Sequence, residues 1–233
     1  MLEKNVTLSL KGCVRGALMC VPVFPGIIVF GAVFGTVAAQ KGLTFLETIL
    51  MNSLVYAGAS QFVAMEIFTE PLDHGTLIAM IGVTAAVNMR MLLIGASLRP
   101  WLGQLPGHQT YPALFFLTDL NWLLTLAQYD KGERDWGIYL GSGLTVWAVW
   151  SLSVIPGYFA GSLICDPKTF GLDLVLPAFF AALLVPLWKG KRQTYSWAIA
   201  GGVAWVTWAL FGGYWGIFTG AFAGAIAGAY LDD

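Results

Sequence analysis

Long apolar stretches separated by short breaks make up most of the chain, and the breaks carry charged residues, glycine or proline. A helix needs about 20 apolar residues to cross a bilayer, and each stretch is long enough to do so. The stretches lie at 15–39, 46–69, 76–98, 111–128, 136–164, 171–188, 194–211 and 213–231. The fourth contains Asp119 and Asn121, and only two glycines separate the last two. The pattern therefore predicts an all-α polytopic membrane protein with seven or eight transmembrane helices.

The composition supports this fold class. Of the 233 residues, 58% are hydrophobic and 11% are charged, against about 45–50% and about 25% in soluble domains. Eight spans with short loops would use the whole length, so we expect a single transmembrane domain over residues 1–233. The formal net charge of −1 provides no basic patch for nucleic acid.

The distribution of lysine and arginine predicts an orientation. If all eight stretches cross, one side of the membrane carries Lys4, Lys11, Arg15, Lys131, Arg134, Lys189, Lys191 and Arg192. The other side carries Lys41, Arg99 and Lys168. Because cytoplasmic loops are enriched in basic residues, we expect a multi-pass protein of the cytoplasmic (inner) membrane with its N-terminus in the cytoplasm.

Residues that would indicate an enzyme, a metal site or a cofactor site are not arranged as those sites require. The three cysteines are isolated from one another, and both histidines, His74 and His108, lie in predicted loops. The sequence contains no nucleophile elbow, zinc-protease motif or nucleotide-binding loop. We therefore predict no catalytic residue, no metal and no cofactor.

Two proline-glycine pairs hint at an internal duplication. Pro25-Gly26 is echoed by Pro156-Gly157, which suggests repeats at about 12–98 and 136–231. Hydrophobic segments interrupted at corresponding places in two halves are typical of secondary transporters, where broken helices expose backbone groups to a substrate. The alternative is that these residues only kink continuous helices, as they often do in membranes.

One basic and one acidic residue lie deep inside predicted spans. Arg90 is eight residues from the end of the third stretch, and Asp119 is eight residues from the start of the fourth. Antiparallel neighbouring helices would place both at one depth, about 12 Å from the same surface. An unpaired arginine there costs about 2.5–3.5 kcal/mol, so we expect Arg90 to pair with Asp119 or to bind a substrate carboxylate. A purely structural ion pair is the alternative.

Small and polar residues gather in the second stretch, in the run from Tyr56 to Phe62. Gly58, Ser60 and Gln61 in this run favour a local helix break, whose free N–H groups would suit a carboxylate. Together with Asn88 of the third stretch, they are our candidate substrate-binding residues. The alternative is that these polar side chains only hold helices together.

The last stretch carries a regular glycine face. A small residue recurs at every fourth position, at Gly212, Gly216, Gly220, Gly224 and Gly228. Such a face lets two helices approach closely, either in a second subunit or within the same bundle, and the sequence leaves both interpretations open.

Five segments in this order resemble the AzlC-type large subunits of branched-chain amino acid exporters. They are Phe34-Gly35, Tyr56-Ala57-Gly58-Ala59-Ser60-Gln61-Phe62, Val87-Asn88-Met89-Arg90, Phe116-Leu117-Thr118-Asp119 and Gly171-Leu172-Asp173 through Pro177-Ala178-Phe179-Phe180. The resemblance implies an inner-membrane carrier with a small hydrophobic AzlD-type partner subunit. Met91 and Leu120 stand where the family commonly has histidine and glutamate.

We therefore expect a secondary transporter that exports branched-chain or other small hydrophobic amino acids as the large subunit of a two-component carrier. Arg90 would bind the substrate carboxylate or hold Asp119 ready for proton transfer. Two alternatives remain open: an uncoupled channel or facilitator with the same spans, and a membrane scaffold subunit that transports nothing.

Overall fold

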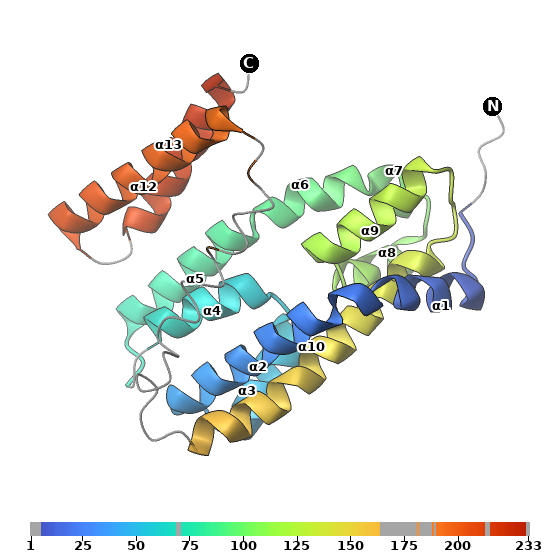
Figure 1. The fold of residues 1–233 in the computed structure, drawn as a ribbon, viewed down its shortest axis with the longest axis horizontal. Coiled ribbons are helices and arrows are strands. Elements are labelled where there is room, and N and C mark those ends of the chain that lie inside the picture. The colour runs from blue at the N-terminus through green and yellow to red at the C-terminus, as the bar shows by residue number, and fades with distance from the viewer. Residues whose placement is uncertain are drawn as a thin grey trace. The chain divides into compact units, whose positions relative to one another are not determined.

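The computed structural model describes residues 6–68, 71–163, 181, 188, 190–212 and 215–231. These residues form helices, and within these ranges there is no β-strand, only an isolated bridge between Thr7 and Asp135. Two compact units are present (Figure 1). Unit 1 contains Met1–Glu66 and Val87–Cys165, and unit 2 contains Ile67–Ala86 and Asp166–Asp233.

Three helical segments of the described chain are long and apolar enough to cross a membrane: Leu10–Gln40, His74–Ser97 and Gly137–Leu163. The first comprises α1 (Leu10–Met19), a short 3-10 turn and α2 (Phe24–Gln40), and the third is α10 (Gly137–Leu163). The second comprises α5 (His74–Asn88) and α6 (Arg90–Ser97). The predicted span 171–188 lies almost entirely outside the described residues.

Glycines bring α1 and α2 against α10 along most of their length. A Cβ added at any of four glycines would collide with a backbone carbonyl of the facing helix. The facing pairs are Gly16 with Ile138, Gly141 with Cys13, Gly35 with Val154, and Gly157 with Ala32. Residues 13–16 face residues 138–141, and residues 32–35 face residues 154–157, so α1 followed by α2 runs parallel to α10. These closely packed helices form the centre of unit 1.

At the second proline-glycine pair, the structure favours the continuous helix over the broken one. α10 continues through Pro156 without interruption, whereas the chain near Pro25 is interrupted by the 3-10 turn Val21–Val23. Close packing of α10 against α2 at Gly157 keeps α10 helical, and neighbouring helices commonly make such prolines tolerable in membranes.

The predicted span 46–69 is instead a hairpin of two helices, α3 (Phe45–Val55) and α4 (Gly58–Ile67), here called the first hairpin. It is bent at Tyr56, which has a left-handed backbone with φ of 46°. α3 runs antiparallel to α10: its first residue contacts Tyr158, and Ser53 near its end accepts a hydrogen bond from Trp147. α4 then turns back along α2, since Gly58 at its start borders Phe30 and Phe62 contacts both Phe30 and Phe34. The apolar stretch 46–69 therefore does not form one continuous helix, and the count of seven or eight spans stays a prediction.

The predicted span 111–128 is also a hairpin, here called the second hairpin. It consists of α8 (Gly107–Leu114) and α9 (Asp119–Asp130). α6 and the following short helix α7 (Arg99–Leu102) run parallel to α9. Three contacts show this direction: Arg90 with Asp119, Ser97 with Trp122, and Trp101 with Tyr129. The predicted antiparallel arrangement is therefore wrong, because α8 already reverses the chain before α9 begins.

The open ends of the second hairpin lie at the end of unit 1 where α1 and α10 begin, here called the N-terminal end of unit 1. Leu98, Trp101 and Leu102 form one buried cluster with Trp136 and Tyr139 at the start of α10. Val6 packs against the same cluster, and the Asp135 carboxylate accepts hydrogen bonds from the backbone N–H groups of Ser9 and Gly137. Arg99 therefore lies at the same end as Lys131, and its predicted place on the opposite side is wrong.

In unit 2, α12 (Lys191–Phe211) and α13 (Trp215–Leu231) form a tightly packed pair. The glycine face is used here: Gly216 and Gly220 approach the carbonyls of Ala204 and Ala200, and Gly224 approaches the Ala200 side chain. Of the two interpretations of this face, packing within the chain accounts for these three glycines.

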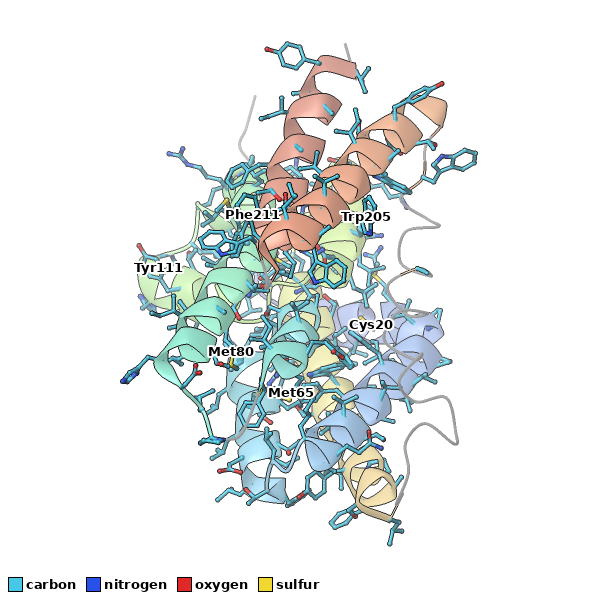
Figure 2. The ribbon with its side chains drawn as sticks, turned by 90° about the vertical axis from the view of Figure 1, so that its left-hand side faces the viewer. Cys20, Met65, Met80, Tyr111, Trp205 and Phe211 are labelled. Carbon is cyan, nitrogen blue, oxygen red and sulfur yellow. The ribbon has the colours of Figure 1, made fainter. Side chains whose placement is uncertain are left out.

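The other two glycines of this face make looser contacts. Gly212 has φ of 65° and ends α12, and a Cβ on Gly228 would be 3.8 Å from Ser196 Oγ. Trp205 and Phe211 on α12 point outward, with 67% and 76% of their surface exposed (Figure 2).

Candidate functional site

The bends of the two hairpins meet inside unit 1. The first tip is Tyr56–Ala57 and the second tip is Phe115–Thr118. The rings of Tyr56 and Phe115 are 5.8 Å apart. The two bends lie beside α10 in Figure 1. Two broken helices that enter unit 1 from opposite ends therefore present their bends to each other.

The meeting point lies near the middle of the longest helix. Trp147 of α10 contacts both hairpins, because its ring is 6.4 Å from that of Phe116 and its Nε1 donates to the Ser53 carbonyl at 3.0 Å. Trp147 is about ten residues from the start of α10, or about 15 Å at 1.5 Å per residue. Half of a hydrocarbon core of about 30 Å is the same distance. Irregular backbone at this depth is tolerated where protein buries it or where it lines a cavity.

The first tip provides a helix N-terminus that carries no acidic residue. An α-helix leaves its first N–H groups without intrahelical partners, and in α4 these begin at Gly58. The first turn of α4 contains no Asp or Glu, so its positive dipole end is not neutralised from within the helix. α3 ends at Val55, two residues before the first tip ends, and brings the negative end of its dipole to the same place. One bend therefore offers donors and acceptors side by side.

The predicted side chains at this tip are already engaged with one another. Gln61 accepts from the Ala57 N–H and donates to the Met51 carbonyl, both at 3.1 Å, and it is 1% exposed. Ser60 Oγ donates to the Ala57 carbonyl at 2.9 Å and accepts from Asn88 Nδ2 at 3.0 Å. The structure thus brings Gln61, Ser60 and Asn88 together, as a brace that holds the first tip in its bent form.

The second tip has a similar brace, which the sequence analysis missed. Thr118 caps α9 by accepting from the Asn121 N–H at 3.2 Å. The Asn121 side chain donates to the Phe116 carbonyl at 3.0 Å and accepts from Ser142 Oγ at 2.7 Å. The signal that could have revealed this break is Thr118, a preferred N-cap residue inside an apolar stretch.

Arg90 and Asp119 are paired beside the second tip. Arg90 Nη2 is 2.9 Å from Asp119 Oδ2, and the two side chains are 48% and 46% exposed. Asp119 is the first residue of α9, where a negative charge is favoured by the helix dipole. The N-terminus of α9 therefore carries its own carboxylate, whereas that of α4 does not.

An aromatic wall lies against the N-terminus of α4. Phe30 stacks on Phe62 with centroids 4.6 Å apart and contacts Trp150 at 5.1 Å. A Cβ added to Gly58 would lie 3.1 Å from Phe30 and 3.4 Å from Trp150, so Gly58 borders this wall directly. Phe34 completes it, 5.5 Å from Phe62. These residues come from three segments far apart in sequence, so local patterns gave no sign that they meet.

Three buried side chains at or near the first tip have polar atoms without a partner. Both amide atoms of Asn52, the Nε1 of Trp150 and the hydroxyl of Tyr56 lack a hydrogen bond, although these residues are 0%, 5% and 8% exposed. Among the described residues, no group of three or more His, Cys, Asp or Glu side chains comes together in the way a metal ion requires. The chemistry offered at the first tip is therefore hydrogen bonding, dipoles and apolar contact.

Comparison with known proteins gives one family. The inner membrane protein YgaZ of Escherichia coli (strain K12) is 28% identical over 201 residues, which cover 83% of this chain and 80% of that protein. The branched-chain amino acid transport protein AzlC of Bacillus subtilis (strain 168) is 26% identical over 199 residues, covering 83% of this chain and 74% of that protein. No solved structure gives a significant match. The sequence profile of the AzlC protein family matches residues 22–164, which include both hairpins, and this chain belongs to that family.

Proposed function

We propose that this chain is the large subunit of a two-component secondary transporter that exports branched-chain or other small hydrophobic amino acids across the cytoplasmic membrane. The observation that carries the proposal is the meeting of two helix bends beside the middle of α10. A relative from Bacillus subtilis is named a branched-chain amino acid transport protein, which supports the substrate class.

In this proposal the substrate lies at the first tip. Its carboxylate binds the N-terminus of α4 at Gly58, where no acidic side chain competes. Its aliphatic side chain packs against the aromatic wall of Phe30, Phe34, Phe62 and Trp150. Such a pocket discriminates one methylene by only about 1–3 kcal/mol, so several aliphatic amino acids should be carried.

We assign the coupling step to Arg90 and Asp119. Protonation of Asp119 would remove its charge from the pair and free the Arg90 guanidinium to act on a nearby carboxylate. The Met91 and Leu120 side chains beside them cannot titrate, so the pair would carry any proton-linked step in this region. Each hairpin would act as the gate for the end of unit 1 from which it enters.

The proposed orientation places the N-terminus in the cytoplasm. Arg15, Arg99, Lys131 and Arg134 lie at the N-terminal end of unit 1, and Lys41 lies at the other end of α2. The positive-inside tendency therefore favours a cytoplasmic N-terminal end. The partner would be a small hydrophobic AzlD-type subunit, which we expect to cover part of the exposed apolar helix surface.

Transport of labelled leucine from preloaded proteoliposomes, with and without the small partner subunit, tests the proposal. We expect efflux that depends on an imposed pH gradient, requires the partner and is abolished by an ionophore. Efflux that ignores the gradient and the ionophore would instead identify an uncoupled facilitator. No amino acid efflux under any gradient, from protein shown to be folded, would contradict the proposal.

A further inference from the structure

Asn52 is the most deeply buried polar side chain without any partner at the first tip. It lies on α3 one turn before Tyr56, it is 0% exposed, and neither Nδ2 nor Oδ1 makes a hydrogen bond. Nearly all buried polar groups in proteins find a partner, because an unpaired one loses its hydration without replacement. An occupant with both a donor and an acceptor is therefore expected beside Asn52.

The packing of α3 places Asn52 at the same depth as a second unpartnered group. Ser53 is hydrogen-bonded to Trp147, and Phe45 contacts Tyr158, so α3 and α10 run antiparallel with these residues level. This register puts Asn52 at the depth of residues 148–151 of α10, a turn that includes Trp150. The free Nε1 of Trp150 is on the indole whose edge lies against Gly58, the first residue of α4.

The unpaired groups match the two charged ends of an amino acid. A cation would leave the Nδ2 donor of Asn52 unpaired, and a simple anion would leave its Oδ1 acceptor unpaired. A zwitterion carries an ammonium and a carboxylate on one carbon atom and can satisfy both. The bend between α3 and α4 also offers a negative helix end next to a positive one.

We propose that Asn52 and Trp150 recognise the zwitterion of an α-amino acid at the first tip. Asn52 Oδ1 and the last carbonyls of α3 bind the ammonium, and Asn52 Nδ2, Trp150 Nε1 and the first N–H groups of α4 bind the carboxylate. Only neutral groups and dipoles take part, so the site needs no charged side chain at mid-membrane. The inference rests on the proposed function for its substrate, but it moves carboxylate recognition away from Arg90, which is paired with Asp119.

The test is direct binding of labelled leucine to the purified chain with its partner subunit. Three unlabelled competitors share one side chain: leucine, leucinamide without the carboxylate, and 4-methylpentanoate without the ammonium. We expect each analogue to compete at least tenfold more weakly than leucine. Equal competition by either analogue would overturn the inference without any mutation.

Two substitutions then test the roles of Asn52 and Trp150 separately. Asn52→Leu should keep the fold, since it removes an unpaired buried amide, but weaken leucine binding at least tenfold and reduce the preference over 4-methylpentanoate. Trp150→Phe keeps the aromatic wall and should reduce the preference over leucinamide. Thr48→Val is the matched control, because Thr48 is equally buried on α3 but its hydroxyl already bonds the Thr44 carbonyl.

The outcomes separate this inference from the proposed function. If the unmodified protein binds no aliphatic amino acid, both fail together. If it binds leucine and Asn52→Leu binds with unchanged affinity and selectivity, Asn52 only holds a water molecule and this inference alone fails. Thermal unfolding of each variant shows whether a lost signal reflects loss of the fold.

Discussion

Replacing Gln61 tests the brace at the first tip. Its side chain satisfies two backbone groups that the helix break leaves open, the Ala57 N–H and the Met51 carbonyl, each at 3.1 Å. Gln61→Leu keeps the volume and removes both hydrogen bonds. In soluble proteins each unsatisfied buried group costs about 1–3 kcal/mol, but interhelical hydrogen bonds in membranes average about 0.6 kcal/mol and reach about 1.7. We therefore expect a loss of about 1–3 kcal/mol in the free energy of unfolding.

The assay is thermal unfolding of the detergent-solubilised protein. For a chain of this size, 1 kcal/mol corresponds to about 2–4 °C in the midpoint, so Gln61→Leu should lower the midpoint by several degrees. Gln104→Leu is the matched control, because Gln104 is exposed and bonds only the Pro100 carbonyl, at 2.8 Å. An exposed change of this kind stays within about 0.5 kcal/mol. Equal midpoints for the two variants would refute the brace.

Three further predictions follow from the same contacts. Arg90→Ala should reduce transport more than tenfold while changing the unfolding free energy by less than about 1 kcal/mol, since the ion pair is half exposed. The double variant that exchanges Arg90 and Asp119 should not restore transport, and a restored rate in the efflux assay would show that the pair is only structural. Gly157→Leu should lower the free energy of unfolding by about 3 kcal/mol or more, because its Cβ meets the backbone of α2. Gly201→Leu on α12 is the control, because a Cβ there faces open space, and equal unfolding midpoints for the two variants would contradict the packing. The pKa of Asp73 is lowered because its carboxylate accepts a hydrogen bond from the Thr76 N–H at 2.6 Å. This stabilisation of the start of α5 is present at neutral pH and is lost as the pH falls through that pKa. Hydrogen exchange at the start of α5 should therefore accelerate in acid, and Asp73→Asn should weaken that acid response.

The sequence was sufficient for the fold class and for part of the site. Low charge and long apolar stretches identify a helical membrane protein without reference to packing. The small-residue run at Tyr56–Phe62 predicted a helix break, and the break is present at Tyr56. Arg90 and Asp119 were expected to meet, and they do, but in parallel helices, because the chain reverses once more than the apolar pattern suggested.

The hairpins could not be predicted from hydropathy. Two helices of about 11 residues that each reach half-way across need the same apolar length as one helix that crosses fully. Asn52 and Trp150 were missed for a different reason. An asparagine in a span is ordinarily interhelical glue, and only the packing of α3 on α10 shows that this one has no partner.

The sidedness of the loops that flank the second hairpin tests the central claim most directly. Cysteine would be introduced at Gln104 or at Lys131 in a chain whose three native cysteines are replaced. A membrane-impermeant maleimide would then be applied to intact cells and to inside-out vesicles. Our account predicts that both positions are labelled from the same side of the membrane, because residues 107–130 enter and return. Labelling from opposite sides would make this segment a crossing helix, and the two tips could not then meet.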